Sequence, residues 1–347
     1  MKAIQLLGKE QIQLNELPKP EISEKEVLIK VKAASICGTD VRMYKNGYPT
    51  ASEETPLTLG HEISGDIVEV GAAVDFYQVG MRVAIAPNMG CGICDQCVSG
   101  NTHLCANYEA FGINLPGGFA EYLVIPEKAV RQGNISLIPD ELSYEEAALI
   151  EPFSCVFNGQ EIAGNKPGDN VLIIGSGPIG IMHAMLARAR GAGKVMMNDL
   201  SEARLADAKK MLPDLITLTS ENLQDKIFAE TNKQGVDLCI IAAPAPQAQE
   251  ASFNYMAING RCLFFGGLPK EKEEVRLNTN ILHYKQLRVF GCTRASLMGY
   301  RTSAQLVASG RIPLQDLITK RYSIDQFTEA LENAQHAIGL KNVIVYK

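Results

Sequence analysis

The stretch VLIIGSGPIG at residues 171–180, with the acidic DLSEAR at 199–204 behind it, decides the fold of this chain. Val171–Ile174 is an apolar run suited to a buried strand, and a helical stretch from Ile179 to Arg190 follows the glycines. Asp199 then ends the next strand-like segment. A tight turn, a helix N-terminus that faces a pyrophosphate and an acidic acceptor for a ribose hydroxyl need residues at these positions. The stretch therefore predicts a dinucleotide-binding β–α–β unit.

The residues of this turn are the candidate cofactor contacts. They are Gly175, Gly177, Pro178, Ile179 and Gly180, together with Asp199 and Arg204. A carboxylate at the strand end accepts from a free 2′-hydroxyl and repels a 2′-phosphate, so Asp199 favours NAD over NADP. Arg204 is either a solvated helix residue or a side chain that packs against the adenine or ribose.

The segments around this turn predict a doubly wound parallel sheet. Strand-like and helical stretches alternate from about residue 165, with strands at 194–198, 215–218, 236–242, 261–265 and 287–291. The first third of the chain reads instead as short alternating strands with Gly and Pro between them, typical of a β barrel or sandwich. The tail from Arg294 has helical stretches at 303–309 and 325–335 and a final strand near 342–346, which could return to the first domain. The expected class is α/β.

Composition excludes several function classes. The 347 residues carry 33 basic and 39 acidic side chains, a formal charge of −6, and the pI is near 5.5, so neither nucleic acid nor an anionic membrane is an expected partner. No signal-peptide core and no long apolar span stands out, so we expect a cytoplasmic protein. Nine cysteines, an odd number, favour reduced thiols or metal ligands over a disulfide framework.

Four of these cysteines form a closely spaced quartet. Cys91, Cys94, Cys97 and Cys105 have the spacing C-x2-C-x2-C-x7-C, and four thiolates suit the closed, tetrahedral coordination of structural zinc. An iron–sulfur cluster is the main alternative, but its bacterial run has three residues before a final Cys-Pro. Here that gap is seven and Ala106 follows Cys105. Accidental clustering of the cysteines is the remaining alternative.

A closed zinc site has no open position for a substrate, so catalysis needs residues elsewhere. The candidates are Cys37 in ICGTD, His61 and Glu62 in GHE, and Glu151 in EP. Three such ligands plus a water or substrate make a catalytic zinc. Each also has an ordinary interpretation: Cys37 as a small buried hydrophobe, His61 as a core histidine and Glu151 as a helix-end charge. The residues alone leave this second site open.

The same motifs resemble those of a known family over the whole length of the chain. CGTD at 37–40, GHE at 60–62, the cysteine quartet, GGFAEY at 117–122, EP at 151–152, GSGPIG at 175–180 and DLSEAR at 199–204 are similar to the zinc-dependent medium-chain dehydrogenases/reductases. Within them, the sorbitol (L-iditol), polyol and L-threonine dehydrogenase branch is the most similar. The resemblance implies a GroES-like catalytic domain at 1–150 and 294–347, with a structural-zinc lobe at 88–107, and a Rossmann domain at 151–293.

The resemblance also implies roles for single residues. Cys37, His61 and Glu62 resemble catalytic zinc ligands, and Glu151 a fourth ligand or the acceptor of a zinc-bound water. Thr39 resembles the hydroxyl that relays the substrate proton. Gly266, Gly267 and Leu268, like Cys292-Thr293, fall where relatives approach the nicotinamide. Two zinc ions per chain, NAD and a homotetramer are therefore expected.

The expected reaction is the reversible oxidation of a secondary alcohol of a polyol to a ketose. Arg42 and Met43 stand where relatives carry His and often Tyr, and Ala295 stands beside Arg294 where a Tyr is usual. Arg42 and Arg294 could together bind an anion, which raises a polyol phosphate such as arabitol or galactitol phosphate as an alternative. L-Threonine and butanediol or another secondary alcohol are further alternatives.

Two other kinds of protein fit the sequence less well. A nucleotide sensor that had lost its chemistry would lack a catalytic ligand, and here all four are present. A zinc-free quinone reductase of the same fold would lack both the quartet and the GHE triplet. The sequence therefore favours a zinc- and NAD-dependent oxidoreductase.

Overall fold

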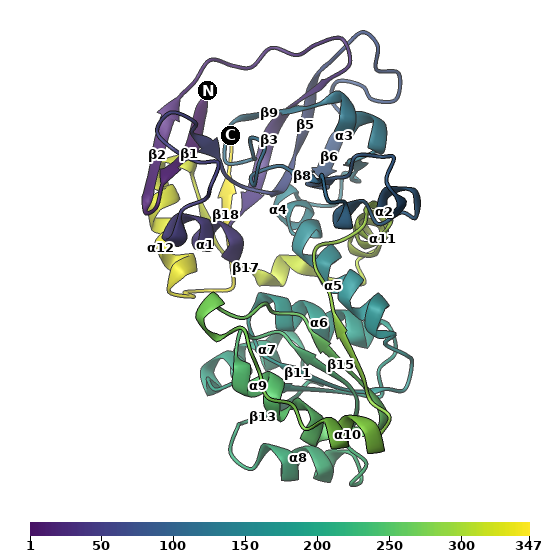
Figure 1. The fold of residues 1–347 in the computed structure, drawn as a ribbon. Coiled ribbons are helices and arrows are strands. Elements are labelled where there is room, and N and C mark those ends of the chain that lie inside the picture. The colour runs from purple at the N-terminus through teal and green to yellow at the C-terminus, as the bar shows by residue number, and fades with distance from the viewer. The chain divides into compact units, whose positions relative to one another are not determined.

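The computed structural model describes all residues from Met1 to Lys347, and the chain divides into two compact units. One unit comprises Met1–Ser154 and Arg294–Lys347, and the other Cys155–Thr293. The first boundary falls inside helix α5 (Ile150–Ala163). Figure 1 shows the helices and strands of each unit.

The second unit is built on a six-stranded parallel sheet. The strand order is β13-β12-β11-β14-β15-β16, and all neighbours run parallel. This is the 3-2-1-4-5-6 order of a doubly wound sheet, with its switch point between β11 and β14. The strands are β11 (Asn170–Ile174), β12 (Lys194–Asn198), β13 (Ile216–Leu218), β14 (Val236–Ile241), β15 (Met256–Phe264) and β16 (Arg288–Gly291). The predicted α/β class is confirmed.

Helices surround this sheet because a parallel sheet must be covered on both faces. Val171 to Ile173 in β11 are fully buried, as the apolar run predicts. Ser201 caps α7, because its Oγ accepts a hydrogen bond from the Arg204 N–H. The helices are α6 (Pro178–Ala189), α7 (Glu202–Met211), α8 (Leu223–Glu230), α9 (Pro246–Ala251) and α10 (Thr279–Tyr284), with 3-10 turns η2 (Ser252–Tyr255) and η3 (Lys270–Lys272).

The first unit is dominated by short antiparallel strands. Its main sheet has the order β10-β6-β5-β3-β18-β17, and β9 also pairs with β3. Nearly every second residue of β3 is buried in a core that β1, β5 and β6 share. The strands are β1 (Lys2–Gly8), β2 (Gln11–Glu16), β3 (Val27–Ser35), β4 (Leu57–Thr58), β5 (Glu62–Val70), β6 (Arg82–Ile85), β7 (Asn88–Met89), β8 (Glu109–Ala110), β9 (Tyr122–Ile125), β10 (Ile135–Leu137), β17 (Ile318–Tyr322) and β18 (Lys341–Val345).

The C-terminal segment completes this sheet. β18 lies between β3 and β17, antiparallel to β3 and parallel to β17. The last strand of the chain therefore joins the sheet through β3, a strand from the start of the chain (Figure 1). Helix α11 begins at Leu297, six residues before the predicted helix, because the Ser296 hydroxyl caps the Gly299 N–H. The remaining helices are α1 (Gly38–Asn46), α2 (Asp95–Val98), α3 (Glu127–Gln132), α4 (Tyr144–Ala148), α11 (Leu297–Ala308) and α12 (Phe327–Gln335), with η1 (Thr102–Leu104), η4 (Leu314–Leu317) and η5 (Ile324–Gln326).

None of these helices combines the length and apolar character needed to cross a lipid bilayer.

A buried histidine in α6 makes the second unit sensitive to acid. His183 has no exposed surface, its ring packs edge-on against Phe265 with centroids 4.6 Å apart, and Gln160 Nε2 lies 3.2 Å from Nδ1. Burial lowers the pKa of His183 to about 3. An unfolded histidine has a pKa of about 6.5. Between these two pKa values the unfolded state binds more protons than the folded state, so the free energy of unfolding decreases as the pH is lowered.

We expect His183→Phe to reduce this acid sensitivity. From pH 7 to pH 5 the histidine costs the wild type about 2 kcal/mol of stability, whereas phenylalanine does not titrate. Urea unfolding of both proteins at the two pH values measures the difference. An equal loss of stability in both would contradict a neutral buried His183.

Candidate metal centres and dinucleotide turn

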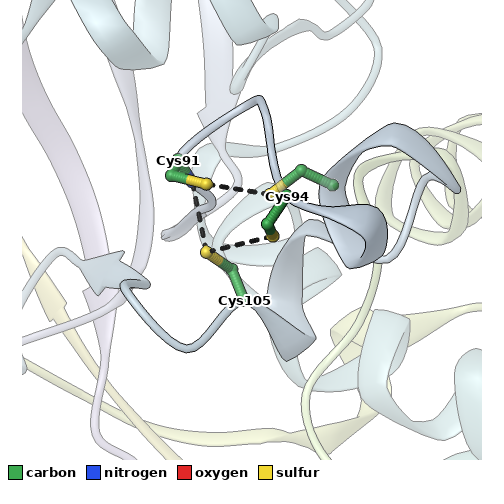
Figure 2. Close-up of side chains that lie close together, drawn as sticks. Cys91, Cys94 and Cys105 are labelled. Carbon is green, nitrogen blue, oxygen red and sulfur yellow. Dashed lines mark hydrogen bonds between the residues drawn. The ribbon is translucent and has the colours of Figure 1, made fainter.

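The four cysteines of the quartet converge on one point. Their sulfurs lie within 4.8 Å of one another, with Cys94 Sγ 3.8 Å from Cys105 Sγ and Cys91 Sγ 4.0 Å from Cys97 Sγ. A zinc–thiolate bond of about 2.3 Å places tetrahedral sulfurs about 3.8 Å apart. Figure 2 shows three of these side chains turned toward one another. The spacing thus fits a closed tetrahedral zinc site.

Hydrogen bonds to backbone groups both favour a thiolate in the quartet and anchor the lobe around it. Cys97 lies within α2, and Cys105 follows η1. The N–H groups of Ile93 and Cys94 lower the pKa of the Cys91 thiol to about 6, which favours the thiolate that binds metal. Gln132 of α3 bonds both the N–H and the carbonyl of Gly90 and so ties the lobe to the rest of the unit.

A second group of possible ligands lies apart from the quartet in the sequence. Ligand atoms of Cys37, His61 and Glu62 lie within 4.8 Å of one another. Cys37 is the N-cap of α1, and Glu62 begins β5 opposite Ser35 of β3. One sulfur, one nitrogen and one carboxylate make the donor set of a zinc with an open position.

The carboxylate of Asp40 faces the Nδ1 side of the His61 ring. This carboxylate is fully buried, and Oδ2 accepts from the Cys37 N–H at 2.8 Å. Oδ1 lies 3.6 Å from His61 Nδ1, and both atoms are buried without a hydrogen-bond partner. Nδ1 therefore faces a carboxylate and Nε2 is the nitrogen left for a metal, the usual arrangement of a metal-bound histidine.

The surroundings of His61 attract positive charge. Burial acts to lower the pKa of this imidazole, but Asp40 and Cys37 outweigh burial, and the pKa is raised well above its usual value. Glu151, at the start of α5, adds to this effect. A cation at Nε2 would meet the same field, so the donor set and the electrostatics both fit a divalent metal.

Lys341 of β18 binds the ligand Glu62 from the other side. Its Nζ lies 2.9 Å from Glu62 Oε1 and 2.6 Å from Oε2, and it also donates to the Ile36 carbonyl at 3.1 Å. The two side chains are 6% and 0% exposed. The ammonium thus offsets one negative charge of a cluster rich in anions, and it was not anticipated from the sequence.

The other residues predicted near the catalytic metal take separate positions. Glu151 is buried but lies outside the group of three ligands. Thr39, in the first turn of α1, accepts a hydrogen bond from exposed Arg42 at 3.1 Å. Arg294 contacts the cysteine lobe and the residue just after it. Its Nη1 donates to the His103 carbonyl at 2.9 Å, and the guanidinium lies 3.7 Å from the Tyr108 ring centroid. Each arginine is engaged by a different segment.

The dinucleotide turn has the shape that its glycines require. Gly175 follows β11 with a φ of +110°, and a Cβ at Gly180 would lie 1.9 Å from the Gly175 carbonyl oxygen. At Gly177, the N-cap of α6, a Cβ would meet no protein atom within 4 Å. Gly177 thus borders open space at a helix N-terminus, where a pyrophosphate would lie.

The remaining predicted cofactor residues lie at the same edge of the sheet. Pro178 and Ile179 form the first turn of α6. Gly266 to Leu268 follow β15, and both Gly175 and Gly266 adjoin Ala243 at the end of β14. Asp199 follows β12 and accepts hydrogen bonds from Ser176 and Ser201. The turn residues therefore gather at the switch point of the sheet.

Removing one quartet cysteine should empty only the closed site. We expect Cys94→Ser to lower the zinc content from two ions per chain to one, because a structural zinc needs all four thiolates. Atomic emission spectroscopy of the purified protein measures this ratio. Retention of both ions by the variant would contradict the assignment of the quartet.

The Lys341–Glu62 pair yields a second prediction. In chelator-treated protein, Lys341→Met should cost about 3–5 kcal/mol of unfolding free energy, because it leaves a buried carboxylate without a partner. Lys341→Met with Glu62→Gln should recover most of this loss. Urea unfolding of the three proteins is the measurement, and equal stability of the single and double variants would contradict the pairing.

Comparison with known proteins agrees with these features. Residues 23–136 match the family described as alcohol dehydrogenase GroES-like domain, and residues 178–309 match zinc-binding dehydrogenase. Sorbitol dehydrogenase of Bacillus subtilis is 36% identical over 96% of this chain and 93% of its own length. L-Threonine 3-dehydrogenase of Yersinia enterocolitica is 34% identical over 96% of each chain.

A solved structure extends the agreement to the fold. A protein of Sinorhizobium meliloti 1021, bound to NADP, superimposes with a TM-score of 0.90 at 31% identity and covers 99% of each chain. The GroES-like and Rossmann parts expected from the sequence are thus both confirmed, as is a zinc-binding dehydrogenase that uses a nicotinamide dinucleotide. The chain belongs to the zinc-dependent medium-chain alcohol dehydrogenase family and acts on a CH–OH group.

Proposed function

We propose that this enzyme oxidises a secondary alcohol of a sorbitol- or iditol-like polyol to the ketose, reversibly and with NAD. The observation that carries the proposal is the group of half-buried Cys37 with buried His61 and Glu62. It offers three ligands and an open position, whereas the quartet offers four and none. The identity to a sorbitol dehydrogenase, 36% over nearly the whole chain, supports the polyol class.

In this proposal the unit with the metal ligands is the catalytic domain, and Cys155–Thr293 is the NAD domain. Zinc held by Cys37, His61 and Glu62 would act as a Lewis acid that lowers the pKa of the substrate hydroxyl. NAD would accept the hydride. Glu151 would serve as a fourth ligand or as the acceptor of a water in the open position.

The chain's own residues orient the ligands and move the proton. Asp40 Oδ1 faces His61 Nδ1 at 3.6 Å, which leaves Nε2 available, and Lys341 bonds both oxygens of Glu62. Thr39 Oγ1 would accept the substrate proton and pass its own to the cofactor ribose or to water. Arg42 donates to the same oxygen and cannot accept a proton because its guanidinium stays charged. Arg42 therefore holds the relay hydroxyl and is not a base.

The contacts of the two arginines bear on the choice of substrate. A polyol phosphate would need a guanidinium that binds its phosphate. Arg42 is engaged with Thr39, and Arg294 with His103 and Tyr108, so we rank the unphosphorylated polyol first. L-Threonine ranks below both polyol classes, because the identity to L-threonine 3-dehydrogenase, 34%, is lower than the 36% to sorbitol dehydrogenase. The homotetramer remains a prediction.

Replacing a catalytic ligand should separate chemistry from cofactor binding. We expect His61→Ala to lower kcat with sorbitol at least about a hundredfold, more than the loss of an outer-shell partner, and to leave the NADH dissociation constant unchanged. Exposed His336→Ala is the matched control and should keep full activity. A fully active His61→Ala enzyme would rule out this site.

A panel of alcohols should rank the substrates. We expect NAD reduction at 340 nm to be fastest, by kcat/KM, with sorbitol, xylitol, arabitol or galactitol. Their phosphates, butanediol and L-threonine complete the panel. A clear preference for threonine, or for a phosphorylated polyol, would overturn the ranking.

A further inference from the structure

The carboxylate of Asp199 is bonded unusually fully for a group expected to receive a ribose. Oδ2 accepts two hydrogen bonds from Ser176, one from the backbone N–H at 2.8 Å and one from Oγ at 2.8 Å. Oδ1 accepts from the Ser201 N–H at 2.9 Å. Ser176 is fully buried inside the GSG turn, and Asp199 is half-buried.

These contacts fix which acceptor positions remain open. An ionised carboxylate offers about four lone-pair sites. Ser176 takes both sites of Oδ2, and Ser201 takes one of the two on Oδ1. The site left over therefore lies on Oδ1. A ribose 2′-hydroxyl can donate to it, whereas a 2′-phosphate brings negative charge and no donor.

The same contacts keep the carboxylate charged. Burial acts to raise the pKa of Asp199, but the hydrogen bonds from Ser201 and Ser176 and the charge of Arg204 outweigh burial and lower it. Ser176 Oγ is the one side-chain donor among the three hydrogen bonds. It can be removed without a change in the backbone.

Arg204 gives Asp199 an alternative partner. It is exposed in the first turns of α7 and close enough to affect the carboxylate. Without the Ser176 hydroxyl, Oδ2 would keep only the bond from the Ser176 N–H, and the carboxylate could turn more readily toward the guanidinium. The ribose 2′-hydroxyl would then lose Asp199 as its acceptor. The guanidinium of Arg204 could instead bind a 2′-phosphate bidentately.

We infer that Ser176 is a specificity-determining residue that locks the Asp199 carboxylate in the orientation that selects NAD over NADP. The inference rests on the proposed cofactor role of Asp199 and deepens it. Ser176 acts through Asp199 and is thus a positioning residue. A relative of the same fold is bound to NADP, so the fold alone does not exclude that cofactor.

The test is direct binding of NADH and NADPH to the full-length protein. The chain has no tryptophan, so the fluorescence of each bound dinucleotide is read without energy transfer from indole. Ser176→Ala should reduce the preference for NADH about tenfold, the effect of one charge-assisted hydrogen bond. Ser201→Ala is the matched control, because its hydroxyl caps the Arg204 N–H and does not bond Asp199. It should leave the preference unchanged.

A double-mutant cycle separates positioning from a merely structural role. Asp199→Asn should itself lower the preference, and Ser176→Ala should have no further effect in that background. The inference fails if Ser176→Ala leaves the preference intact, weakens both dinucleotides equally, or acts equally in the Asp199→Asn protein. If the wild type binds neither dinucleotide, the proposed function fails first, and that result is distinct from all three.

Discussion

The buried pairing of Glu62 with Lys341 is the interaction on which the proposed catalytic centre depends. A thiol, a carboxylate ligand and two further carboxylates, Asp40 and Glu151, are crowded around His61 within the core of one unit. Such a group is stable only if cations offset its charge. Lys341 supplies one positive charge, and a bound metal would supply the rest.

The same pairing explains why the C-terminal segment belongs to the first unit. Lys341 begins β18, which lies beside β3, while Glu62 begins β5 on the other flank of β3. The Ile36 N–H donates to the Asn342 carbonyl of β18. The chain just before Cys37 is therefore held between β5 and β18. The position of the thiol ligand is therefore set by three neighbouring strands, two of them from the start of the chain and one from its end.

Features whose residues lie close together in the sequence could be predicted, whereas contacts between distant residues could not. The dinucleotide turn and the cysteine quartet are local, so spacing and glycine positions predicted them closely. The catalytic ligands came from family resemblance, since no spacing rule joins Cys37 to His61. Lys341 was missed because its partner Glu62 lies 279 residues away, although a lysine at the start of a buried strand was a signal. The locking role of Ser176 was missed because it depends on side-chain directions that a motif does not encode.

Two metal ions should occupy two unlike sites, and anomalous diffraction from crystals of the zinc-loaded enzyme tests this most directly. Data collected on both sides of the zinc absorption edge should show two peaks per chain. One should lie among the sulfurs of Cys91, Cys94, Cys97 and Cys105, and the other against Cys37 Sγ, His61 Nε2 and Glu62. A single peak at the quartet, with none at His61, would contradict the account.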